Sequence, residues 1–266
     1  MASITSTLAS ATAVPAVPAY LSIVRDEAAL ADKFASATPQ VKAEIAYLNK
    51  QAPRLTSADA LMKDYRALGI VLKSFGMKDQ LAYPGLVRRL LTEDPTSKTS
   101  TAQKIGNASY LRFATAMNQY KTNPLADAKS LAAVTKAYVL NGYEAAQGQQ
   151  IPGMEQALAF RRQASQVTSI AQLMSNTPVL KVAVTQTGID YATFGAMDYN
   201  RQVALLTKKV KLADLQNPTK VDRIAEQYLI SAGQDAMAWG ATTTATNTVA
   251  SLFGATGTTS VLSLFA

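Results

Sequence analysis

The residues of this chain that are best suited to chemistry are few and lie apart from one another. Glu93 and Asp94 are adjacent carboxylates, but adjacent side chains at a helix end or in a loop usually point apart. We therefore expect them to be solvated turn residues rather than an acid and base pair. Residues 254–259 resemble a phosphate-binding loop in composition only, because they have no lysine and no preceding strand. Neither feature predicts an active site.

The 266 residues contain no histidine and no cysteine. Histidine is the commonest general base near neutral pH, and both side chains are the usual ligands of zinc and other transition metals. Their absence excludes a serine–histidine–aspartate triad, a thiol nucleophile, a disulfide framework and a conventional zinc site. We therefore predict a protein that is not an enzyme and that uses no cofactor or metal.

Positive charge is concentrated in one part of the chain. The net charge is +8, and residues 61–120 carry nine Lys and Arg against four Asp and Glu. One interpretation is a surface for an acidic partner, with Arg88 and Arg89 as contacts. The competing and favoured interpretation is solvated helix faces, because the basic pairs 88–89, 161–162 and 208–209 are separate and have few interleaved aromatic residues. The same spacing argues against nucleic-acid binding.

Most of the chain has the apolar periodicity of helices. The clearest stripe runs from Leu61 to Phe75 and predicts one helix ending at Gly76. We expect another of about 18 residues from Thr101, and one that ends near Asn141–Gly142. Only residues 179–185 resemble a strand. The predicted fold class is an all-α helical bundle.

The helical pattern returns after about 112 positions. Leu173–Met174 corresponds to Leu61–Met62, and Gly188 corresponds to Gly76. We interpret the bundle as two diverged copies of one multi-helix unit, residues 25–148 and 149–240. The best candidate for a linker between them is Gln147–Gly153, which is rich in glutamine and glycine.

The ends of the chain, residues 1–24 and 241–266, contain no charged side chain. Residues 1–24 lack the positive region of a cleaved secretory signal, and threonines and glycines interrupt the tail too often for a membrane span. Two interpretations of the tail remain open: a loosely docked terminus, or an assembly and export segment that orders against other subunits. Its candidate assembly residues are Val249, Leu252, Phe253, Val261, Leu262, Leu264 and Phe265.

Five short segments resemble a family of uncharacterised alphaproteobacterial proteins, domain of unknown function 1217, encoded among flagellar genes. They are Tyr65–Leu68, Phe75–Gly76, Arg88–Leu91, Asp94–Pro95 and Phe113–Ala116. The resemblance covers residues 30–235, rests on packing residues and implies a flagellar context without active-site residues. The uncharged ends are similar in kind to those of flagellar axial subunits, which cross an export channel unfolded. The basic net charge departs from such subunits and leaves an accessory role open.

The sequence therefore predicts a non-enzymatic structural or accessory component of the bacterial flagellum. It would be exported without cleavage and would assemble through its termini as a homo- or hetero-oligomer. Its partners would be flagellar axial or basal-body proteins, or copies of itself. The alternative is a cytoplasmic adaptor or regulator that binds an acidic partner through the basic face around Arg88 and Arg89.

Overall fold

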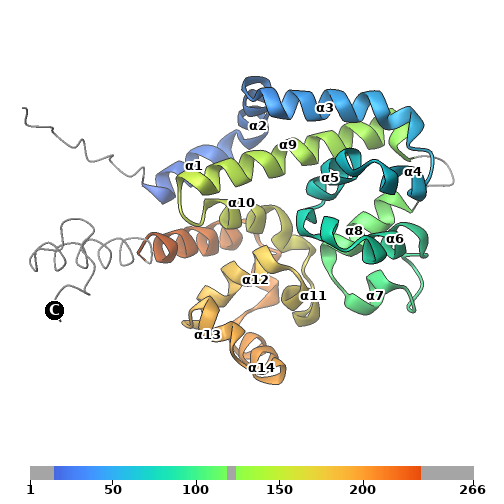
Figure 1. Cartoon of the computed structure of the whole chain (residues 1–266). Coiled ribbons are helices and arrows are strands. Elements are labelled where there is room, and N and C mark those ends of the chain that lie inside the picture. The colour runs from blue at the N-terminus through green and yellow to red at the C-terminus, as the bar shows by residue number, and fades with distance from the viewer. Residues whose placement is uncertain (1–14, 119–123, 235–266) are drawn as a thin grey trace, which may run out of the picture.

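The structure, a computed structural model, describes residues 15–118 and 124–234 (Figure 1). Within these ranges the chain forms helices and turns without any strand, which confirms the all-α fold. The helices of the first part are α1 Ala16–Arg25, α2 Glu27–Ala37, α3 Pro39–Gln51, α4 Ala58–Lys63, α5 Tyr65–Ser74, α6 Pro84–Thr92, α7 Thr101–Ile105 and α8 Ala108–Met117. Those of the second part are α9 Ala128–Gln150, α10 Met154–Gln163, α11 Ile170–Ser175, α12 Thr177–Val184, α13 Tyr191–Gly195, α14 Tyr199–Lys209, α15 Leu212–Leu215 and residues 218–234.

The longest of these helices, α9, is the axis of the molecule. Its 23 residues contact α2, α3, α5 and α10, and Figure 1 shows it crossing the molecule beside α3. It continues past Asn141–Gly142, where the sequence predicted a stop. A side chain at Gly142 would meet the Phe34 ring at 3.4 Å, so the glycine allows α2 to pack closely rather than ending the helix. Buried residues of both predicted copies belong to one continuous core.

Two predicted helices are each divided in two. The predicted helix 61–75 breaks at Asp64, which accepts a 2.9 Å hydrogen bond from the Ala67 amide and caps α5. The predicted helix from Thr101 ends after five residues, because Gly106 adopts a φ of 68° and Asn107 caps α8. Residues 179–184, the candidate strand, lie in α12, which Asn176 caps.

The predicted linker is a closely packed junction. Residues 147–150 are the last turn of α9, and only residues 151–153 form a turn. Gly148 lies against Glu155, because an added Cβ would lie 2.6 Å from the Glu155 Cβ. Gly153 has a φ of 83° and would bring a Cβ within 2.8 Å of the Ala232 Cβ. The two parts are thus held together by close contact rather than separated by a flexible segment.

Several local features recur at the predicted offset. Serines cap α4 and α11, an Asp and an Asn cap α5 and α12, and a glycine of positive φ follows each pair of helices. The matched positions are Ser57 and Ser169, Asp64 and Asn176, and Gly76 and Gly188. These recurrences are consistent with a duplicated unit, which stays a prediction.

A buried ion pair joins α9 to α10. Arg162 donates from Nε and Nη2 to Glu144 at 2.8 and 2.7 Å, and the Glu144 residue is only 2% exposed. Arg162 Nη2 also donates to Asn141 Oδ1, while the Asn141 amide donates to the carbonyls of Lys73 and Ser74 at the end of α5. Burial lowers the pKa of Arg162, but the hydrogen bond and charge of Glu144 outweigh it and raise that pKa overall. The guanidinium therefore stays charged and holds three helices together.

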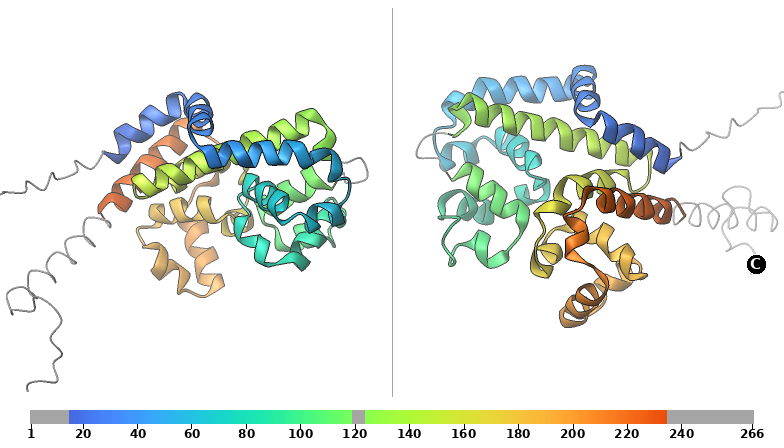
Figure 2. Two further views of the ribbon diagram at one scale, coloured as in Figure 1. Left: turned by 45° about the horizontal axis from the view of Figure 1, so that its top comes forward. Right: turned by 180° about the vertical axis from the view of Figure 1, so that it is seen from behind.

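The first and last described helices lie side by side. The Tyr20 hydroxyl on α1 donates to Asp222 Oδ1 at 2.8 Å, and Arg161 Nε on α10 donates to the same oxygen at 2.9 Å. Tyr20 is fully buried, so α1 belongs to the folded body, although the sequence assigned residues 1–24 to an N-terminal segment for partners. Both views of Figure 2 show that the described chain begins and ends at the same end of the molecule. Residues 1–14 and the predicted tail 241–266 lie outside the described residues.

Replacement Arg162→Met should lower the free energy of unfolding by about 3 kcal/mol or more, because it leaves the Glu144 carboxylate buried without a partner. Chemical denaturation at neutral pH would measure the change. The matched control is Lys220→Met, which removes an exposed ion pair with Asp214 and should cost less than about 1 kcal/mol. Equal losses in the two variants would contradict the role given to the buried pair.

Candidate functional site

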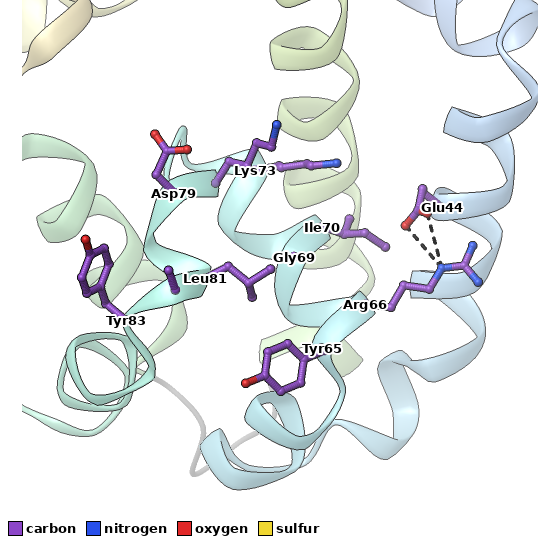
Figure 3. A pocket seen from close by; sticks show the side chains of 11 residues that line it. Glu44, Tyr65, Arg66, Gly69, Ile70, Lys73, Asp79, Leu81 and Tyr83 are labelled. Carbon is purple, nitrogen blue, oxygen red and sulfur yellow. Dashed lines mark hydrogen bonds and ion pairs between the residues drawn. The ribbon is translucent and has the colours of Figure 1, made fainter.

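An open groove lies beside α5 (Figure 3). Its volume is about 810 Å³, and it lies between α5 and the short 3₁₀ turn η2, Lys78–Ala82. Gly69, Ile70 and Leu81 form its apolar part. Tyr65 and Tyr83 line it as well, and they are 63% and 61% exposed. Exposed tyrosines around an apolar hollow are typical of protein interfaces.

Charged side chains surround the apolar part of the groove. Arg66 Nε lies 3.4 Å from Glu44, and its guanidinium stacks 4.2 Å from the centre of the Tyr47 ring. Lys73 Nζ lies 5.8 Å from the centre of the Tyr138 ring. Each cation is thereby held over an aromatic face, and Figure 3 shows Arg66 and Glu44 paired at one side of the groove. Cations held over aromatic rings beside an apolar hollow are suited to binding a partner.

Gly69 lies in the middle of α5, where glycine is costly. The nearest atom to an added Cβ would be Leu81 Cδ2 at 3.9 Å, an ordinary contact. Gly142 and Gly148 in α9, by contrast, face Phe34 and Glu155 at 3.4 and 2.6 Å. Packing within the described chain therefore explains the glycines of α9 but not Gly69, which instead deepens the groove.

The predicted contact residues Arg88 and Arg89 lie outside this groove, on the exposed side of α6. Arg88 pairs with Asp59 at 2.5 Å, and both side chains are more than half exposed. The groove was not predicted from the sequence, although one signal was present: Gly69 lies inside a strongly periodic helical stretch, four residues after Tyr65. The predicted assembly residues of the tail lie outside the described residues: Val249, Leu252, Phe253, Val261, Leu262, Leu264 and Phe265.

The adjacent carboxylates Glu93 and Asp94 have structural roles. Glu93 accepts hydrogen bonds from the amide and the hydroxyl of Thr101, which hold the pKa of Glu93 below its usual value. Asp94 accepts from the amide and the hydroxyl of Thr96, with the same effect on the pKa of Asp94. Both carboxylates stabilise the turn between α6 and α7.

Within residues 15–118 and 124–234, no group of three or more Asp or Glu side chains is placed to hold a metal ion. No helix of this part of the chain has both the length and the apolar character needed to cross a bilayer.

Replacement Gly69→Ala should raise the free energy of unfolding by about 0.5–1 kcal/mol, because it removes a helix-interior glycine without a clash. Gly148→Ala is the matched comparison in α9 and should lower stability, since its Cβ would collide with Glu155. Thermal and chemical unfolding of both variants would measure these changes. A destabilised Gly69→Ala variant would show that the described packing around α5 is tighter than these contacts indicate.

Comparison with known proteins gives a fold and a family. A crystal structure of a protein from Agrobacterium tumefaciens has a TM-score of 0.70 and 24% identity, and the match covers 81% of this chain and 91% of that one. This likeness shows the fold alone. No curated protein matches the chain. The model of the family described as protein of unknown function (DUF1217) matches residues 74–221, more than half of the chain. The chain therefore belongs to the DUF1217 family.

Proposed function

We propose that this protein is a non-enzymatic structural or accessory component of the bacterial flagellum that is exported without cleavage and assembles through its two ends. The flagellar context comes from the resemblance described for the sequence. The observation that best supports assembly through the ends is the pairing of α1 with residues 218–234. Because the Tyr20–Asp222 hydrogen bond joins these helices, both chain ends leave the folded body at one place and can reach the same partner.

The composition of the ends is suited to burial in an assembly. No charged residue precedes Arg25 or follows Asp235, so burying these ends desolvates little charge. Each large apolar side chain of the tail would contribute about 1.5–3 kcal/mol when fully buried, before the cost of ordering is subtracted. Flagellar axial proteins, basal-body proteins or further copies of this chain are the partners that the proposal implies.

Deletion of residues 241–266 should leave the helical body folded and abolish assembly or export. The body should keep its helical circular dichroism and its unfolding midpoint, because residues 15–118 and 124–234 already form one continuous core. The measurement is the distribution of the protein among cells, medium and sheared filaments. The full-length chain with Arg88→Ala and Arg89→Ala is the control and should assemble normally. An unchanged distribution after the deletion would contradict the proposal.

The alternative function is a cytoplasmic adaptor or regulator that binds an acidic partner through its basic face. The observation that favours it is the exposure of Arg88 and Arg89 on α6, near Lys104 on α7 in the same part of the fold. Arg88 already shares its charge with Asp59, so Arg89 is the more available of the pair.

Under this alternative, Arg88→Ala with Arg89→Ala should weaken binding to an acidic probe and flatten its salt dependence, because fewer ionic contacts remain to be screened. Fluorescence anisotropy with labelled poly-glutamate at several salt concentrations would measure both effects. Lys208→Ala with Lys209→Ala, an exposed basic pair on α14, is the matched control. If both pairs of substitutions weaken binding equally, the attraction is a general effect of net charge rather than a site.

A further inference from the structure

One face of α5 borders the groove along most of the length of the helix. The α5 residues that line the groove are one turn apart or adjacent, so they form a single stripe: Tyr65, Arg66, Gly69, Ile70 and Lys73. The stripe from Tyr65 to Lys73 is about 12 Å long, because each helical residue rises about 1.5 Å. The other side of α5 is buried in the core. The groove therefore presents about two turns of one helix face to a partner.

The stripe changes in character from one end to the other. Tyr65 at the first end is 63% exposed, and Gly69 leaves the middle without a side chain. Lys73 at the second end is half-buried. Figure 3 shows Tyr65 and Lys73 toward opposite ends of the groove, with Gly69 and Leu81 between them. An aromatic and apolar end is thus followed by a basic end.

The charges that line the groove are not balanced. Arg66 is paired with Glu44. Lys73, Lys78 and Asp79 form no ion pair with any other described residue, which leaves two cations against one carboxylate. Lys73 is also partly removed from water, and the Tyr138 ring at 5.8 Å is its aromatic neighbour. A carboxylate from a partner would complement this end of the groove.

The elements around the groove favour a helix as the bound segment. The described residues contain no strand, so no sheet edge is present there to which an extended peptide could add. A helix binds between helical elements through side chains at positions i, i+3 or i+4, and i+7. Gly69 fits this mode, because a glycine lets the backbone of a partner approach closely. Packing within the described chain gives no other reason for this glycine.

We propose that the groove beside α5 binds an amphipathic helix of another protein, with apolar side chains along one face and a carboxylate at one end of that face. The apolar side chains fill the space over Gly69 between Tyr65 and Leu81, and the carboxylate pairs with Lys73. Exposed tyrosines are effective anchors, because they bury a large area with little loss of conformational freedom. The net charge of +8 adds a long-range attraction for an acidic partner. This binding is independent of the proposed assembly through the chain ends.

The first test is selection on the full chain from a displayed library of randomised helical peptides of about 20 residues. Wild type and Gly69→Leu are used in parallel. The added side chain should fill the groove without unfolding α5, since the nearest atom to a Cβ at this position is 3.9 Å away, and circular dichroism checks the fold. Peptides retained only by the wild type should have apolar residues at helical spacing and an Asp or Glu at one end. The absence of such peptides, or selection of peptides without a carboxylate, would overturn the inference.

The second test is fluorescence anisotropy with the best selected peptide. Tyr65→Ala should raise the dissociation constant about tenfold or more, because it removes an anchor. Tyr199→Ala on α14 is the matched control, since Tyr199 is 61% exposed, and it should have no effect. An equal loss in the two variants, or no loss in Tyr65→Ala, would contradict binding at the groove.

The role of Lys73 is tested by a double-mutant cycle. Lys73→Ala should weaken binding about two- to fivefold, and so should replacement of the peptide carboxylate by an amide. The two changes together should cost no more than either alone, because they remove the same contact. Lys104→Ala, at an exposed lysine of α7, is the control for net charge. Fully additive losses would place the carboxylate elsewhere and overturn the assigned orientation.

The other candidate occupant is the uncharged tail of this chain. A synthetic peptide of residues 241–266 should not displace the selected peptide, because it has no carboxylate side chain for Lys73. Displacement as strong as that by the unlabelled selected peptide would make the tail the occupant and overturn the inference. The flagellar proposal is tested separately by the filament fractions, so either proposal can fail while the other holds.

Discussion

The fold depends on the requirement that a charge inside a protein be paired. Glu144 on α9 is buried, and the Arg162 guanidinium of α10 neutralises it. The same guanidinium orients Asn141, whose amide satisfies two carbonyls at the end of α5. Helix α5 and the consecutive helices α9 and α10 are thereby fixed around one side chain. The nearby carboxylate of Glu27 has a raised pKa, first because it is partly buried and then because of the charge of Glu144.

Arg161, next to Arg162 in the chain, makes a second charged contact near the two ends of the described chain. Because Arg162 is directed toward α9, Arg161 on the adjacent face of α10 reaches Asp222, which also accepts from Tyr20. The place where both ends leave the body is therefore set by the position of α10 on α9. The sequence interpretation treated residues 161 and 162 as a solvated basic pair, and this was wrong. Arg161 and Arg162 instead join helices within the core and at its edge. The groove beside α5 lies on another part of the same helical body.

Two helix breaks were missed because helical apolar periodicity continues across them. Asp64 and Asn107 each cap a helix with their own side chains, which accept from amides two or three residues ahead, inside stretches that were predicted as single helices. The stops at Asn141–Gly142 and in residues 147–150 failed for a different reason. There, the side chains that make turns in short peptides are used for tertiary contacts: Asn141 with α5 and α10, Gly142 with Phe34, and Gly148 with Glu155.

The sequence by itself determined the all-α class and the exclusion of histidine and thiol chemistry, because these follow from residue types and from spacings of a few positions. Its family resemblance was confirmed over residues 74–221. Only the tertiary structure decided that α1 is part of the body, that the groove contains Gly69, and that Tyr20 meets Asp222 across 202 positions. Such contacts depend on how helices pack, and helical periodicity specifies that a face is buried without specifying which helix buries it.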